Sequence, residues 1–114
     1  MYIVETVSWV AKVGVESQQM IDAVTLMLPV LQKVPGFKYQ SLSQKEIMQE
    51  TSNTDSACQW LQLYYWDTVE NAHNSNEIMA PTASLAHLIS LIEPESIAID
   101  IFIPQQQSSR LMLD

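Results

Sequence analysis

The sequence has few of the residues that build several common kinds of functional site. Cysteine occurs once, as Cys58, so the chain forms no internal disulfide and has no cysteine cluster for a metal. Two glycines leave no glycine-rich phosphate loop and no dinucleotide-binding fingerprint. No Ser-His-Asp order and no metal-ligand spacing is present. We therefore expect neither a bound metal nor a required organic cofactor.

Basic residues and long hydrophobic runs are also scarce. Five basic residues stand against thirteen acidic ones, and the net charge of −8 would repel a polyanion such as nucleic acid. No apolar run approaches the roughly 20 residues of a membrane span, so we expect a soluble chain. The first ten residues, MYIVETVSWV, lack the basic region and cleavage site of a signal peptide, which predicts cytoplasmic residence. A small molecule or another protein is the expected partner.

The chain has enough apolar material for one compact domain. Hydrophobic residues make up 47% of its 114 residues, which is too many for a disordered segment. No internal repeat or linker divides it. We expect a single domain over residues 1–104, followed by a C-terminal tail over residues 105–114.

The first half of the chain predicts a strand, a helix and a second strand. Residues 2–13 are rich in β-branched and aromatic side chains, which favours a strand. Residues 17–34 place apolar side chains on one helical face, with Ser17 as the N-cap. Pro29 lies opposite this apolar stripe, so we expect it to bend the helix rather than break it. Pro35-Gly36 ends the helix, and residues 37–49 form the second strand.

The second half repeats the alternation of strands and helices. Residues 51–56 have loop composition, and residues 57–66 are the clearest strand of the sequence. Asp67 has the spacing of an N-cap for a short helix. A further helix over 82–92 and a fourth strand over 95–103 complete the pattern.

The order β-α-β-β-α-β predicts an α+β, ferredoxin-like sandwich, in which helices cover one face of an antiparallel sheet. We expect Trp60, Tyr64, Trp66 and Phe102 on the face that the helices do not reach. Such an apolar patch is uncommon on a monomer. We therefore expect a homodimer that packs sheet to sheet, as a dimeric α+β barrel.

Several short motifs resemble those of the dimeric α+β barrel superfamily, particularly its antibiotic-biosynthesis-monooxygenase-like branch. The resemblance covers nearly all of residues 2–103. The motifs are Pro35-Gly36-Phe37, Leu63-Tyr64-Tyr65-Trp66-Asp67, Ala72-His73 and Ser75. The resemblance implies a cofactor-free oxygenase, a haem-degrading enzyme or a member without known activity.

The sequence also departs from these relatives. The second histidine that often follows the first is absent from residues 74–77. Haem-degrading relatives resemble one another in a triad of residues. It consists of Asn on the first strand, Trp on the helix after the third strand, and His beyond it. The first strand here has no Asn, and residues 68–76 have no Trp. Haem degradation by that triad is therefore not expected.

The two histidines have different predicted positions. On a helical wheel His73 can share the inward face with Val69 and Ala72. It is then either a structural group with a hydrogen bond or a group that binds ligand or transfers a proton. His87 falls opposite the apolar stripe of its helix, so we expect it in solvent.

The remaining candidates each have a structural and a functional interpretation. Trp66 and Tyr64 either pack in the dimer or line a flat aromatic pocket, and Trp9 and Tyr39 are further pocket candidates. Asp100, among isoleucines, is either exposed at a rim or buried with a raised pKa. Paired with Glu5 across neighbouring strands, Asp100 could form an acid/base dyad. Cys58 is most simply a small buried hydrophobe.

Two functions are compatible with these residues. The first is a cofactor-independent monooxygenase that holds a flat or aromatic substrate against Trp66, Tyr64, Trp9 and Glu5, with His73 and Asp100 as catalytic groups. The second is a non-catalytic dimeric module for binding or stress response. A cavity that connects His73, Trp66 and Asp100 would favour the first.

Overall fold

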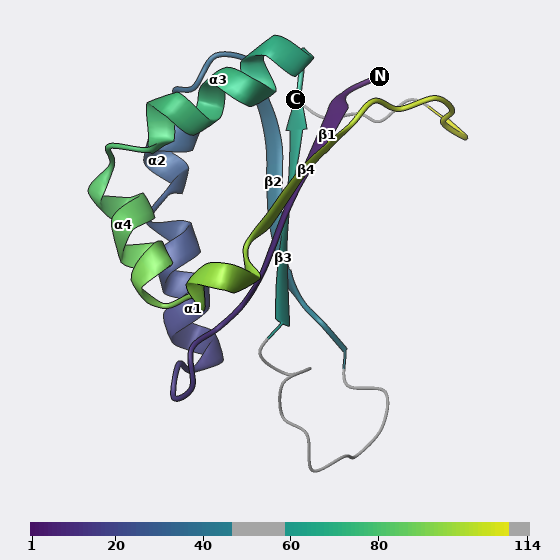
Figure 1. Cartoon of the computed structure of the whole chain (residues 1–114). Coiled ribbons are helices and arrows are strands. Elements are labelled where there is room, and N and C mark those ends of the chain that lie inside the picture. The colour runs from purple at the N-terminus through teal and green to yellow at the C-terminus, as the bar shows by residue number, and fades with distance from the viewer. Residues whose placement is uncertain (47–58, 110–114) are drawn as a thin grey trace.

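The computed structural model describes residues 1–46 and 59–109. One antiparallel sheet of four strands has the order β2-β3-β1-β4, and the helices lie against one of its faces (Figure 1). The strands are β1 (Ile3–Val10), β2 (Phe37–Gln44), β3 (Gln59–Trp66) and β4 (Ala98–Phe102). The helices are α1 (Ser17–Thr25), α2 (Leu28–Leu31), α3 (Val69–Met79) and α4 (Ala83–Ser90), with a 3-10 turn, η2 (Pro94–Ser96), before β4. The predicted α+β, ferredoxin-like fold is confirmed.

The two central strands, β1 and β3, set which side chains face the helices. Ile3 lies opposite Trp66, and the register continues to Val10 opposite Gln59. Since successive side chains point to opposite faces, every second residue of each strand lies under the helices. On β1 these include Glu5 and Trp9, which are buried.

The structure corrects the predicted face of the tryptophans. Trp60, Tyr64 and Trp66 are buried on the face that the helices cover, not on the open face. Phe102 does lie on the open face, where 54% of its surface is exposed. The alternation of side chains along β3 was predicted correctly. The set that faces the helices was chosen wrongly, because both sets contain large apolar residues.

The first helical region is two helices rather than one bent helix. Helix α1 ends at Thr25, and α2 begins at Leu28 with Pro29 in its first turn. A proline has no N–H for the carbonyl of Thr25 and clashes with it, but it is tolerated in a first turn. The prediction that Pro29 only bends the helix was therefore wrong.

Two predicted N-caps lie one residue away from the observed ones. Helix α1 is capped by Glu16, whose backbone N–H donates to Gln19 Oε1 at 2.7 Å. Helix α3 is capped by Thr68, whose hydroxyl accepts from the Asn71 N–H at 3.1 Å. Helix-capping side chains satisfy N–H groups that have no partner within the helix.

The Pro35-Gly36 turn lies against the start of α3. Gly36 has φ +83, and a Cβ at this position would collide with the side chains of Asp67 and Asn71. The Asp67 N–H donates to the Gly36 carbonyl at 3.0 Å, and Asn71 Nδ2 donates to Asp67 Oδ1 at 2.8 Å. This hydrogen bond with Asn71 is the main cause that lowers the pKa of the exposed Asp67. Glycine is thus required where the two motifs meet.

Some predictions concern residues outside the described ranges. They are the end of the second strand (47–49), the loop over 51–56, Cys58 and the last residues of the tail (110–114).

Candidate functional site

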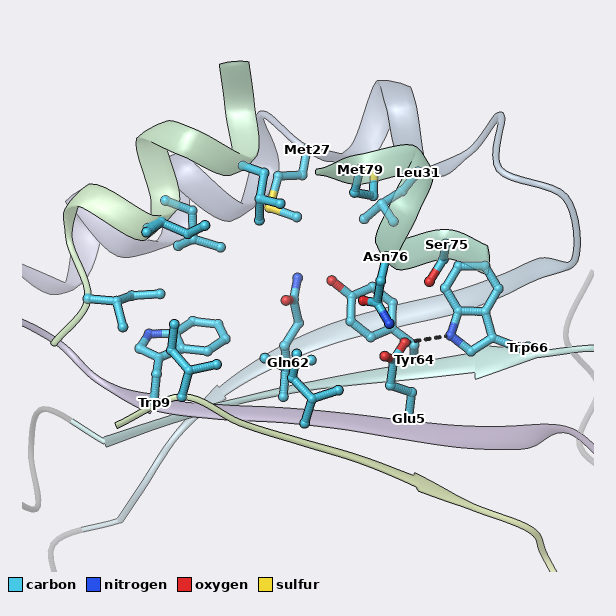
Figure 2. Close-up of a pocket in the computed structure, with 17 residues that line it drawn as sticks. Glu5, Trp9, Met27, Leu31, Gln62, Tyr64, Trp66, Ser75, Asn76 and Met79 are labelled. Atoms are coloured by element: carbon cyan, nitrogen blue, oxygen red, sulfur yellow. Dashed lines mark hydrogen bonds between the residues drawn. The ribbon is translucent and has the colours of Figure 1, made fainter. Parts of the chain in front are cut away.

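A hydrogen-bonded pair of buried side chains joins β1 to β3. Trp66 Nε1 donates to Glu5 Oε1 at 2.9 Å (Figure 2). The Tyr64 ring stacks near the Trp66 ring at 5.8 Å between centroids, and Phe37 meets Trp66 edge-on at 5.8 Å. These ring contacts hold the indole of Trp66 in place, so that its N–H remains bonded to Glu5 Oε1.

Beside this pair lies a cavity of about 170 Å³ between the sheet and the helices. Its floor comes from β1 and β3, through Glu5, Trp9, Gln62, Tyr64 and Trp66. Met27, Leu31 and Met79 face this floor from the helical side (Figure 2). A cavity of about 150 Å³ is enough for one benzene ring, so this one fits a small ring compound.

Part of the cavity lining next to the edge strand β4 is exposed. Most of its lining is buried, but Ile89 of α4 and Ile99 of β4 are 44% and 51% exposed. Ile97, just before β4, is also exposed. The exposed part of the lining on and next to α4 and β4 is therefore apolar.

Three polar atoms of the cavity floor have no hydrogen-bond partner within the part of the chain that the structure describes. They are Glu5 Oε2, Trp9 Nε1 and Gln62 Nε2. Their side chains are 1%, 1% and 2% exposed, respectively. Figure 2 shows the Gln62 amide rising from the sheet into the cavity. An unsatisfied buried polar group costs about 1–3 kcal/mol, so three in one cavity are a marked feature.

Burial shifts the pKa of two groups on the floor. Removal from water raises the pKa of Glu5 above its ordinary value of 4.5, although the hydrogen bond from Trp66, the nearby Asn76 amide and the nearby His73 oppose the rise. Burial, aided by the neighbouring charge of Glu5, also raises the pKa of the Tyr64 hydroxyl, although the nearby Gln62 amide opposes the rise. Glu5 thus keeps its proton to higher pH than a carboxyl in water.

Four of the predicted site residues meet in this cavity. Glu5, Trp9, Tyr64 and Trp66 all line it, although the sequence had suggested that the last two could belong to a dimer core. Their roles remain predictions.

The two predicted catalytic groups lie elsewhere. His73 is exposed on α3, so the prediction that it faces inward was wrong; the buried face of α3 is Ala72, Ser75 and Met79. Asp100 lies opposite Thr6 and is exposed on the open face, whereas Glu5 points under the helices. The Glu5–Asp100 dyad is therefore not formed.

Other histidine and aromatic candidates also have clear positions. His87 is exposed, as predicted. Tyr39 lies on the open face, 39% exposed, and contacts Tyr65 at 5.4 Å between ring centroids. Trp60 is buried under the helices but does not line this cavity.

Sequence reasoning missed Gln62 and Asn76. Gln62 shares the face of Trp60 and Tyr64 by simple alternation, and a polar residue among buried aromatics was the signal that could have found it. Asn76 lines the cavity one turn after Ala72 on α3 and lies close to Glu5. The wrong assignment of the β3 face hid Gln62, and the wrong assignment of the α3 face hid Asn76.

Across residues 1–46 and 59–109, no three His, Cys, Asp or Glu side chains gather into a group that could hold a metal ion. None of the helices described there is long and apolar enough to cross a membrane.

Comparison with solved structures supports the fold. SnoaB, a cofactor-independent oxygenase from Streptomyces nogalater, matches with TM-score 0.64 and 12% identity, over 96% of this chain and 98% of that one. An antibiotic biosynthesis monooxygenase, so named provisionally, from Chloroflexus aurantiacus matches with TM-score 0.60 and 13% identity, over 96% and 98%. A dimeric ferredoxin-like protein of unknown function from Thermobifida fusca matches with TM-score 0.60 and 11% identity, over 89% and 90%.

The sequence itself has no such matches. No protein-family model matches the chain, and no curated protein matches it. The resemblance to antibiotic-biosynthesis-monooxygenase-like and ferredoxin-like dimeric α+β barrel proteins is confirmed at the level of the fold.

Proposed function

We propose that this chain binds a small, flat, largely apolar molecule in the cavity between the sheet and the helices. The observation that carries this proposal is the coincidence of three aromatic side chains with three unpaired polar atoms in one cavity. Ligand sites are typically apolar pockets with a few polar groups that fix orientation. Ligand atoms that pair with Glu5, Trp9 and Gln62 would remove the cost of leaving them unsatisfied.

We further propose that the bound molecule is a substrate for cofactor-independent monooxygenation. The similarity in fold to SnoaB supports this reaction, and a buried carboxyl beside the cavity can hold a substrate proton. For a phenol, a ring C–H beside or opposite the hydroxyl would become a carbonyl. One oxygen atom of O₂ enters the ring and the other leaves as water, while the substrate supplies all four electrons and becomes a quinone.

Oxygen uptake by the purified protein tests this function. A panel of one-ring and two-ring phenols is supplied without added metal or flavin, and O₂ consumption and quinone absorbance are followed. Uptake in wild type that Trp66→Phe reduces would support the oxygenase. Tight binding without any uptake would instead favour the alternative, a non-catalytic binding module of the same fold. The absence of histidine from the described cavity lining favours that alternative.

We also propose a homodimer that forms through the open face of the sheet. Tyr39, Leu61 and Phe102 are exposed there, and Tyr2 stacks on Tyr65 at 6.1 Å between ring centroids. A partner sheet would remove these apolar groups from water. Sedimentation at micromolar concentration should give twice the chain mass, and Phe102→Asp should shift the protein to monomer. A wild-type monomer would contradict the dimer.

A further inference from the structure

The unpaired atoms of the cavity floor point to a more specific ligand. Resting on the proposed function, we propose that the cavity selects an uncharged ring compound with a hydroxyl at one end and a carbonyl at the other. Glu5 Oε2 accepts from the hydroxyl, and Gln62 Nε2 donates to the carbonyl. Glu5 is thereby the residue that determines specificity.

The register of the sheet places the two groups at a suitable separation. Glu5 lies opposite Tyr64, and Gln62 lies opposite Val7, so Glu5 and Gln62 are diagonal neighbours on one face. Such neighbours are about 7–8 Å apart along the sheet. A single ring with substituents at opposite positions bridges this separation. Tyr64 lies beside the gap and presents its ring to the same cavity (Figure 2).

The hydrogen-bond inventory assigns the direction of each contact. Glu5 Oε1 is already occupied by the indole N–H of Trp66, so only Oε2 remains for a ligand. At a pH above its raised pKa, Glu5 is ionised, so it accepts and cannot donate, which favours a ligand hydroxyl. Gln62 Nε2 and Trp9 Nε1 are both donors, and Trp9 lies two residues beyond Val7 on the same strand. That end of the cavity therefore favours an acceptor.

The charge of the lining excludes anionic ligands. Among the described residues that line the cavity none is Lys, Arg or His, and Glu5 has the one carboxyl group among them. A ligand carboxylate or phosphate would be buried beside Glu5 without a counter-charge, which is strongly unfavourable. An uncharged phenol meets no such penalty.

A matched pair of probes tests the proposal by calorimetric titration. The first is 4-hydroxyacetophenone, at a pH where Glu5 is ionised and the ligand phenol is not, and the second is its methyl ether, which keeps the carbonyl but lacks the donor. We expect wild type to bind the phenol about tenfold more tightly, the value of one hydrogen bond to a charged acceptor. In Glu5→Gln this preference should shrink severalfold, since the amide is a weaker acceptor. Glu70→Gln, an exposed glutamate of α3 outside the cavity, is the matched control and should retain it.

The other end of the ligand has its own pair of probes. Gln62→Leu should reduce the preference for 4-hydroxyacetophenone over 4-ethylphenol, which lacks the carbonyl. The anion 4-acetylbenzoate should bind far more weakly than 4-hydroxyacetophenone or 4-ethylphenol, which are both neutral.

The outcomes separate this inference from the proposed function. Equal affinity of wild type for the phenol and its methyl ether would overturn the role of Glu5 while the binding function stands. This comparison of the phenol with its methyl ether uses wild type alone, so it can be made even if a variant does not fold. No binding of any neutral ring compound would overturn the binding function, and the inference with it.

Discussion

The two faces of the sheet carry the same kinds of residue in different arrangements. Under the helices, Trp9, Tyr64 and Trp66 surround a carboxylate and an amide that have unpaired atoms. On the open face, Tyr39 and Phe102 stand among serines, threonine and the exposed Asp100. Polar atoms on the open face reach water, whereas those under the helices do not.

This difference bears on where chemistry can occur. A hydrogen bond or a charge counts for more in a low-dielectric interior than at a wet surface. Glu5 under the helices has a raised pKa because of its burial. The covered face is therefore suited to bind and orient a small molecule, and the open face is suited to contact another protein surface.

Truncation of Trp66 should give the largest loss of stability. Trp66 is 1% exposed, and its N–H is the partner of Glu5. We expect Trp66→Ala to lower the free energy of unfolding by about 3–5 kcal/mol, because it leaves a cavity and a carboxylate without its donor. Urea denaturation monitored by circular dichroism measures this loss.

Leu61 on the same strand is the control for Trp66. It faces the open side and is 40% exposed. Leu61→Ala, added to the monomeric Phe102→Asp variant and compared with that variant, should cost about 1 kcal/mol or less. A larger loss from Leu61→Ala than from Trp66→Ala would mean that the two faces have been exchanged.

The assignment of the faces also shows how far the sequence could predict the fold. Period-two alternation correctly placed Trp60, Tyr64 and Trp66 together and Leu61 on the other side. Alternation alone does not show which of the two sets the helices cover, because both sets are apolar enough to be covered. Gln62 does not resolve this choice, because a polar side chain favours the open face, whereas the structure buries Gln62 under the helices.

The turns offer a second comparison between a packed and an open position. Gly14 and Gly36 both have positive φ, but a Cβ at Gly14 meets nothing within 4 Å, whereas one at Gly36 meets Asp67 and Asn71. Gly14→Ala should cost about 1–2 kcal/mol for the backbone conformation alone. Gly36→Ala should cost about 1–3 kcal/mol more through overpacking. Thermal melts of both variants measure the difference, and equal losses would refute the packing argument.

Glu5→Gln should change how stability depends on pH. The folded pKa of Glu5 is raised above 4.5, so the folded state binds its proton more tightly than the unfolded state. The free energy of unfolding of wild type therefore falls as pH rises from about 4.5 through the folded pKa. The fall amounts to about 1.4 kcal/mol for each pH unit that separates the folded pKa from the unfolded one. Gln does not titrate, so the variant should become progressively more stable relative to wild type across this window.

Denaturant unfolding across that pH range measures the effect. Glu70→Gln removes an exposed carboxylate from α3, away from the open face, and is the matched control. If both variants follow the same curve relative to wild type, burial of Glu5 is not the cause.

The site could be predicted only in part, for a related reason. Glu5, Trp9, Tyr64 and Trp66 were found from residue type and strand position, and these four share the cavity. His73 was misplaced because the apolar residues of α3 are few, so a helical wheel cannot fix which face turns inward. Asp100 was paired with Glu5 because neighbouring strands place residues side by side, but the register sets the two on opposite faces.

Loss of His73 should have the smallest effect on stability. His73 is exposed, so His73→Ala should lie within about 0.5 kcal/mol of wild type in a thermal melt. The charge of His73 nevertheless lowers the pKa of Glu5. Removal of this charge should therefore raise the folded pKa of Glu5, and the pH range over which the free energy of unfolding falls should extend to higher pH. His87→Ala removes an exposed histidine from α4 and should leave that window in place. A stability loss of about 1–3 kcal/mol from His73→Ala would instead indicate a buried hydrogen-bonded group. The face of α3 that covers the cavity would then be different.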